Sequence, residues 1–233
     1  MLISHTHKFI YLKPMKVAGT TTEVFFKKYC IDPNKIPLFE KQLQQNKLDI
    51  DFHFPSEPQY GIINNGHNGD ITYPQFNKPH MTCEEIIRAI GDDDRLREEI
   101  WEEYTKITNV RNPWDLLVSM WHWEKRKKNN SIWAQKVDFK EYAKHHWIIS
   151  NLKKNQKIWA YQDKYNFEYI RFENLEEDIL KVCKKIGINV TNLHLGNFKK
   201  INRKPYQEYY DEETKKIVGE VYKKEIDLFK YKF

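Results

Sequence analysis

A short apolar segment near the N-terminus leads directly into a basic loop and a helix, and it constrains the fold more than any other part of the sequence. Residues 9–12 form a continuous apolar run, which is typical of a strand buried on both faces of a parallel sheet. Lys13 and Pro14 end the run, and residues 20–29 favour a helix. Small residues and hydroxyls stand where the loop enters the helix, so unpaired N–H groups and the positive helix end can face an anion. The segment therefore predicts an anion-binding loop.

The order strand, loop, helix recurs twice further along the chain. Residues 104–110 alternate as a strand, and Asn112 and Pro113 then supply a cap and a first-turn proline for a helix. Residues 168–172 favour a third strand, and Asn174 caps the helix that follows. Further helices are expected from capping and helical spacing over residues 82–91, 95–103, 138–149 and 211–226.

Strands that alternate with helices predict an α/β fold. We expect a single P-loop-like domain over residues 1–233, with a central parallel sheet flanked by helices. Ligands of such sheets bind outside the carboxyl ends of the strands, so the loops after Leu12, Val110 and Phe172 should share one edge. Residues 31–80 carry many prolines and Asn-Gly turns, and we expect an irregular insertion there.

Composition and cysteine usage set broader limits. Lys and Arg number 39 against 33 Asp and Glu, a net charge of +6 that favours anionic ligands without resembling a dedicated nucleic-acid binder. Cys30, Cys83 and Cys183 are far apart and lack metal-site spacing, so they predict neither a disulfide framework nor a zinc site. No signal, transit or membrane segment is recognisable, and we expect a soluble, cytoplasmic chain that is complete from Met1.

The order of residues in the basic loop separates it from the Walker sequence. GxxxxGK[ST] places its lysine after the last glycine, whereas Lys16 precedes Gly19 here. A P-loop-type kinase is therefore less favoured but remains the alternative enzyme, and it would require ATP and Mg²⁺. A non-catalytic module that binds polyanions is the third class.

Residues 14–21, Pro-Met-Lys-Val-Ala-Gly-Thr-Thr, closely resemble the 5′-phosphosulfate loop of carbohydrate sulfotransferases, written PK-T-x-G-T-[ST]. The resemblance implies transfer of a sulfuryl group from 3′-phosphoadenosine 5′-phosphosulfate (PAPS) to an acceptor hydroxyl, without a metal. It also implies that Lys16 contacts the bridging oxygen and stabilises the leaving phosphate. The residues implied to bind the 5′-phosphate and sulfate are Ala18, Gly19, Thr20, Thr21 and Thr22. Taken alone, the loop also fits an ordinary strand-turn-helix with a surface lysine.

Two further segments resemble the nucleotide site of this family. Residues 110–113, with Ser119 eight positions after Arg111, resemble the 3′-phosphate site written VR[ND]P. Arginine can hold a phosphate through two parallel hydrogen bonds, and a serine hydroxyl can add another. More loosely, Arg203 and Lys204 resemble the C-terminal region that closes over the nucleotide, although a solvated basic run fits equally well. The product of the reaction would be adenosine 3′,5′-bisphosphate.

In-line sulfuryl transfer requires a base for the acceptor proton, and such a base typically contributes about 10²–10⁴-fold. His80 occupies the position of a histidine found in some uronyl-type carbohydrate sulfotransferases, just before the helix that precedes the VR[ND]P strand. It is the first choice, His67 the second and Glu23, one turn into the loop helix, the third. The acceptor is expected to be a carbohydrate hydroxyl, and the sequence identifies neither the carbohydrate nor the oligomeric state.

Overall fold

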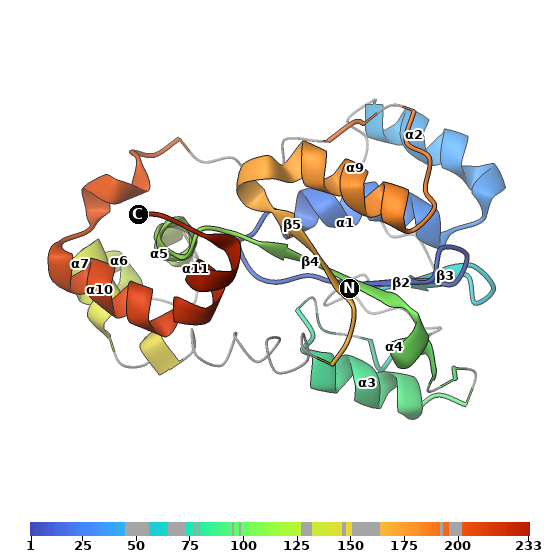
Figure 1. The fold of residues 1–233 in the computed structure, drawn as a ribbon, viewed down its shortest axis with the longest axis horizontal. Coiled ribbons are helices and arrows are strands. Elements are labelled where there is room, and N and C mark those ends of the chain that lie inside the picture. The colour runs from blue at the N-terminus through green and yellow to red at the C-terminus, as the bar shows by residue number, and fades with distance from the viewer. Residues whose placement is uncertain are drawn as a thin grey trace. The chain divides into compact units, whose positions relative to one another are not determined.

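The chain divides into two compact units (Figure 1). A computed structural model describes all residues except 45–55, 65–72, 77, 79, 95, 98, 127–131, 146–147, 151–163, 192 and 196–201. Unit 1 comprises Met1–Asn109 and Tyr161–Phe198, and unit 2 comprises Val110–Ala160 and Lys199–Phe233. Each unit has a hydrophobic core, and the expected single domain over residues 1–233 stays a prediction.

Unit 1 is built on a five-stranded sheet with the order β3-β1-β2-β4-β5. The strands are β1 (Leu2–Ser4), β2 (Phe9–Leu12), β3 (Gly61–Ile63), β4 (Thr105–Val110) and β5 (Phe167–Arg171). β1 pairs antiparallel with β2 and β3, while β2 pairs parallel with β4. Hence β2, β3 and β4 share one direction and β1 opposes them. The predicted α/β class with a mostly parallel central sheet is confirmed, and the short reversed strand β1 is an addition that the sequence did not indicate.

Helices cover both faces of this sheet. Figure 1 shows α1 (Gly19–Lys27), α2 (Ile36–Gln44) and α9 (Leu175–Lys185) on one face, with α3 (Cys83–Gly91) and α4 (Glu99–Glu103) on the other. Short 3₁₀ helices span Lys28–Cys30, Pro33–Lys35, Phe172–Asn174 and Tyr206–Tyr209. Because side chains alternate across a strand, one set of strand residues packs against α1, α2 and α9. That core contains Phe9, Tyr11, Phe25, Phe26, Phe39, Ile63, Ile107, Ile170 and Ile179.

Two of the predicted caps at helix starts are confirmed, whereas the side chain of Asn174 makes no capping hydrogen bond at α9 and donates to Glu177 and Asp178 instead. At α3, Thr82 Oγ1 accepts a hydrogen bond from the N–H of Glu85 at 3.2 Å, and Glu85 Oε2 accepts one from the N–H of Thr82 at 2.9 Å. At α5 (Pro113–Arg126), Asn112 Oδ1 accepts a hydrogen bond from the N–H of Trp114 at 3.1 Å. Each cap satisfies N–H groups that the first helical turn leaves unpaired.

The segment expected to be irregular, residues 31–80, contains two regular elements, α2 and β3. Pro37 does not prevent α2, because it stands in the first turn, where a missing N–H is not needed for the helical ladder. The proline-rich composition therefore predicted less regular structure than the chain forms. Part of this segment lies outside the described residues.

Unit 2 is helical in its described parts. It contains α5, α6 (Ile132–Lys136), α7 (Phe139–Lys144), α10 (Glu212–Val221) and α11 (Lys223–Phe229). Its core is formed by Trp114, Leu117, Val118, Trp121, Phe139, Tyr142, Val218 and Tyr222. Across both units, none of the helices in the described ranges is long and apolar enough to cross a membrane.

The pairing of β1 with β3 depends on a glycine. A Cβ atom on Gly61 would lie 2.2 Å from the carbonyl oxygen of Ile3 and 3.0 Å from Cβ of Cys30. Backbone atoms cannot move aside as a flexible side chain can, so we expect Gly61→Ala to lower the free energy of unfolding by about 1–3 kcal/mol in a denaturant titration. The control is Gly219→Ala on α10, where the new Cβ would lie 3.5 Å from Cζ2 of Trp114. That helix should become more stable by up to about 1 kcal/mol, and equal losses in the two variants would contradict the close contact.

Candidate functional site

The loop between β2 and α1 holds two residues in the left-handed backbone region. Lys16 and Ala18 both have φ of 62°, and such conformations typically cost a non-glycine residue about 1–3 kcal/mol. Ala18 is the N-cap of α1, and no side chain in the described part of the protein caps the helix there. The N–H groups that a first helical turn leaves without intrahelical partners can face an anion, and anion binding by this loop stays a prediction.

Close packing beneath the loop requires a glycine at position 19. A Cβ atom on Gly19 would lie 2.8 Å from Cγ of Lys13 and 3.2 Å from the carbonyl oxygen of Pro14. The hydroxyl residues that follow differ in exposure: Thr20 is half-buried, Thr21 is 8 % exposed and Thr22 is fully buried. Asn109 Nδ2 donates a hydrogen bond to Oγ1 of Thr22 at 2.9 Å. Thr22 is thus placed to support the loop, rather than to offer its hydroxyl to a ligand as the resemblance implied.

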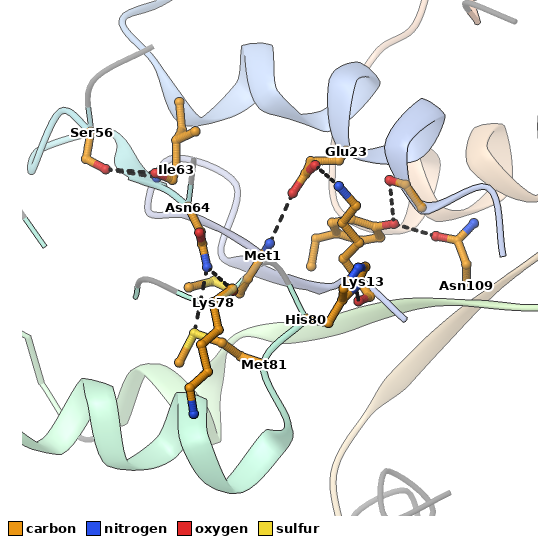
Figure 2. A network of polar contacts seen from close by, with 12 residues as sticks. Met1, Lys13, Glu23, Ser56, Ile63, Asn64, Lys78, His80, Met81 and Asn109 are labelled. Atoms are coloured by element: carbon orange, nitrogen blue, oxygen red, sulfur yellow. Dashed lines mark hydrogen bonds and ion pairs between the residues drawn. The ribbon is translucent and has the colours of Figure 1, made fainter. Parts of the chain in front are cut away.

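Glu23 forms an ion-pair network behind the loop (Figure 2). Its Oε2 pairs with Nζ of Lys13, and its Oε1 lies 3.1 Å from the amino group of Met1. Burial raises the pKa of Glu23, but the two cations outweigh this effect and hold the pKa below its usual value. The carboxylate therefore stays ionised with both oxygens engaged. This arrangement favours a supporting role over the third-choice base role.

His80 lies beside the start of the loop, and its side chain is exposed. Its Nδ1 is 2.8 Å from the carbonyl oxygen of Lys13, a contact visible in Figure 2. A carbonyl oxygen can only accept, so Nδ1 carries the hydrogen and the neutral ring presents Nε2 as its acceptor. The surrounding protein displaces water and lowers the pKa of His80, and the hydrogen bond to Lys13 only partly opposes this shift. The ring is therefore neutral near pH 7 and suited to accept a proton.

His67, the second-choice base, lies outside the described residues. Among the candidates that the structure does describe, His80 combines an exposed ring, a fixed tautomer and a contact with the loop.

In unit 2, two of the predicted nucleotide-binding residues, Arg111 and Arg203, converge on Asp115. Arg111 Nε donates to Asp115 Oδ2 at 2.8 Å, and Nη2 of Arg111 lies 2.6 Å from the same oxygen. Arg203 Nη2 pairs with the other carboxylate oxygen, Oδ1. The side chains of Arg111, Asp115 and Arg203 are 7 %, 13 % and 14 % exposed. One largely buried carboxylate thus holds two guanidinium groups.

The same cluster has unused hydrogen-bonding capacity. Nη1 of Arg203 is buried and has no hydrogen-bond partner among the described residues, which is costly unless an anion or water satisfies it. Ser119 is 5 % exposed and stands one turn beyond Asp115 on the same face of α5. Lys204 does not belong to this group, because its side chain is 75 % exposed and its Nζ lies 3.7 Å from Glu208.

Sequence reasoning missed Asp115 as the organising residue. Its spacing of four from Arg111 was an available signal for an ion pair, but its contact with Arg203 joins residues 88 positions apart. A pairing of Arg171 with Glu173 is another interpretation that the sequence allows. The partner that the structure shows is Asp178, which receives hydrogen bonds of 2.7 Å from Nε and Nη2 of Arg171.

Comparisons with known proteins identify the domain type. A family model described as "Sulfotransferase domain" matches residues 73–226, more than half of the chain. The matched range includes His80, Arg111, Ser119 and Arg203, and it begins after the β2–α1 loop. The chain is also 35 % identical over 97 residues to an uncharacterized protein of Archaeoglobus fulgidus. The aligned region covers 41 % of this chain and 78 % of that protein. No solved structure matches the chain.

The arginine cluster can be tested as an anion site without a nucleotide. Asp115→Asn removes the carboxylate that the guanidinium groups of Arg111 and Arg203 share, and we expect it to lower the free energy of unfolding by about 3–5 kcal/mol. Inorganic phosphate should restore part of this loss, because an oxyanion can bind the two arginines. Thermal unfolding with and without phosphate measures the effect.

The matched control for this experiment is Asp178→Asn. It removes a buried carboxylate from Arg171, whose side chain is 40 % exposed and can be solvated by water. Phosphate should stabilise this control much less than Asp115→Asn. Equal phosphate responses in the two variants would argue against an anion site at Arg111 and Arg203.

Proposed function

The chain belongs to the sulfotransferase family, and we propose that it transfers the sulfuryl group of PAPS to a hydroxyl of a carbohydrate. The observation that carries the proposal is the hydrogen bond from His80 Nδ1 to the carbonyl oxygen of Lys13. It fixes a proton acceptor beside the loop that resembles the 5′-phosphosulfate site. A base next to the transferring group is what hydroxyl sulfation requires.

Two separate clusters suited to oxyanions support PAPS as the donor, because PAPS carries a 5′-phosphosulfate and a 3′-phosphate. The β2–α1 loop offers first-turn N–H groups and Lys16 for the former. Arg111, Arg203 and Ser119 offer charge-assisted and neutral hydrogen bonds for the latter. Nη1 of Arg203, which is buried and has no hydrogen-bond partner in the part of the chain that the structure describes, is the feature of unit 2 that best fits a phosphate oxygen.

Each residue has a defined task in this proposal. When bound, PAPS supplies a sulfuryl group whose bond to the 5′-phosphate breaks as the bond to the acceptor oxygen forms. His80 Nε2 takes the proton that the acceptor hydroxyl loses. Lys16 and the loop N–H groups stabilise the negative charge that develops on the departing phosphate. Glu23 and Thr22 hold the loop in place and take no part in proton transfer.

The alternative functions are less well supported. A P-loop-type kinase would be expected to carry its lysine after the final glycine of the loop, and here Lys16 precedes Gly19. A module that only binds polyanions would not need a neutral histidine with a fixed tautomer next to the loop. The position of His80, which resembles that of the uronyl-type enzymes, is the reason for proposing a carbohydrate acceptor.

The pH dependence of the rate tests His80. His80 must be neutral to accept a proton, so the wild-type rate should fall as the pH drops through the lowered pKa of His80, below about 6.5. His80→Ala should lower kcat by about 10²–10⁴-fold, abolish this acidic limb and leave the affinity for adenosine 3′,5′-bisphosphate nearly unchanged.

The control for His80 is His5→Ala. His5 also has a pKa lowered by burial, and its Nδ1 lies 3.0 Å from Oη of Tyr104, but it precedes β2 and so lies at the sheet edge opposite to the loop. His5→Ala should keep the acidic limb. Near-normal turnover in His80→Ala, combined with loss of turnover in His67→Ala or Glu23→Ala, would show that the base is misassigned.

Lys16 should act on the transition state more than on binding. Charge on the departing phosphate grows during the reaction, so Lys16→Ala should lower kcat by a larger factor than it raises the Kd for PAPS. Single-turnover rates and equilibrium binding measure the two factors. Lys204→Ala is the matched control, since this exposed lysine pairs with Glu208 and its loss should change neither quantity. A purely binding effect of Lys16→Ala would remove Lys16 from the leaving-group role.

A further inference from the structure

A buried chain of hydrogen bonds connects the sheet to the underside of the β2–α1 loop. Tyr11 Oη lies 2.7 Å from Oδ1 of Asn109 and 3.1 Å from the carbonyl oxygen of Gly19. Asn109 Nδ2 donates to Oγ1 of Thr22 at 2.9 Å. The three side chains are at most 2 % exposed. They come from β2, β4 and α1, and none of them belongs to the sequence motifs that predicted a base or an arginine site.

The single hydrogen of Tyr11 Oη is shared between Oδ1 of Asn109 and the carbonyl oxygen of Gly19. Together with the helical hydrogen bond from the N–H of Thr22 to the carbonyl oxygen of Ala18 at 3.2 Å, these contacts hold the carbonyl side of two peptide groups at the start of α1. A peptide group is planar and trans, so fixing its carbonyl oxygen also fixes its N–H, which points the opposite way. The carbonyl of Gly19, which faces Tyr11, shares its peptide group with the N–H of Thr20. Oγ1 of Thr22 lies 3.5 Å from the carbonyl oxygen of Ala18, whose peptide group carries the N–H of Gly19. The N–H groups of Gly19 and Thr20 therefore point away from the buried chain.

We propose that Tyr11 and Asn109 are positioning residues, which orient the N–H groups of Gly19 and Thr20 toward the 5′-phosphosulfate. The proposal rests on the proposed function, because it assigns those N–H groups to this part of the donor. Tyr11 and Asn109 act through Gly19 and Thr22. Burial raises the pKa of Tyr11, so its hydroxyl stays protonated and remains a donor.

The tyrosine ring and its hydroxyl have separable tasks. The ring stacks on Phe26 with centroids 6.1 Å apart and belongs to the main core of unit 1. Tyr11→Phe keeps this packing and removes only the hydroxyl. The variant therefore tests orientation of the loop with little change to the core.

The test must distinguish loop orientation from general stability. Adenosine 3′,5′-bisphosphate and adenosine 3′-monophosphate differ only in the 5′-phosphate, so the Kd of the monophosphate divided by the Kd of the bisphosphate measures what the loop contributes. A variant that is merely less stable loses apparent affinity for both nucleotides in the same proportion, and the ratio stays constant. Isothermal titration calorimetry gives both Kd values for each variant.

We expect Tyr11→Phe and Asn109→Leu to reduce this ratio by about threefold to tenfold, the effect of losing a typical buried hydrogen bond. Thr108→Val is the matched control. Thr108 precedes Asn109 on β4, is 1 % exposed, and its Oγ1 has no hydrogen-bond partner among the described residues. Replacing this buried hydroxyl should leave the ratio unchanged.

The outcomes separate the inference from the function on which it rests. An unchanged ratio in Tyr11→Phe, with a wild-type protein that clearly prefers the bisphosphate, overturns the positioning role and leaves the proposed function intact. If the wild-type protein binds both nucleotides equally well, the proposed 5′-site fails and the inference fails with it. If Asn109→Leu does not fold, Tyr11→Phe decides the question alone.

Discussion

Lys13, the residue directly after β2, makes the contacts on which the rest of unit 1 depends. The main chain of Lys13 accepts the hydrogen bond from His80, while its side chain pairs with Glu23 on the helix that follows the loop. One residue thus joins the end of the strand, the proton acceptor and the loop helix. Gly19 must pass close over Lys13 for this arrangement to form, and any Cβ there would overlap the lysine side chain. The geometry of the base and that of the loop therefore cannot vary independently.

In unit 2, ion pairs between side chains organise the candidate site, whereas in unit 1 the backbone of the loop does so. Buried ion pairs contribute little to stability, because the desolvation of the charges offsets their attraction. Here the guanidinium groups of Arg111 and Arg203 share the carboxylate of Asp115. Such an arrangement is understandable when a ligand completes it. The buried Nη1 of Arg203 marks where the described residues leave a donor for that ligand.

Features encoded by neighbouring residues were predictable, and features created by distant contacts were not. The buried strand of residues 9–12, the cap at Thr82 and the cap at Asn112 follow from local sequence, and the structure contains all three. Strand β1 has only three residues and no alternation of its own, so its reversed pairing becomes visible only in the sheet. Among the site residues, Asp115 meets Arg203 across 88 positions. Tyr11 looked like an ordinary member of an apolar run, because no local pattern indicates that its hydroxyl reaches the loop.

The conformation of the loop explains why so many polar groups are buried around it. Left-handed backbone at Lys16 and Ala18 typically costs about 1–3 kcal/mol for each residue. One hydrogen bond contributes a net stabilisation of only about 0.5–1.5 kcal/mol, so it does not offset the conformational cost at both Lys16 and Ala18. The several hydrogen bonds of the Tyr11–Asn109–Thr22 chain together offset part of this cost. An anion that accepts hydrogen bonds from the first-turn N–H groups would stabilise the same loop conformation further. The loop should therefore be most rigid when its ligand is bound. The more the buried hydrogen bonds of Tyr11, Asn109 and Thr22 order the loop beforehand, the less of the ligand's binding free energy is needed to order it.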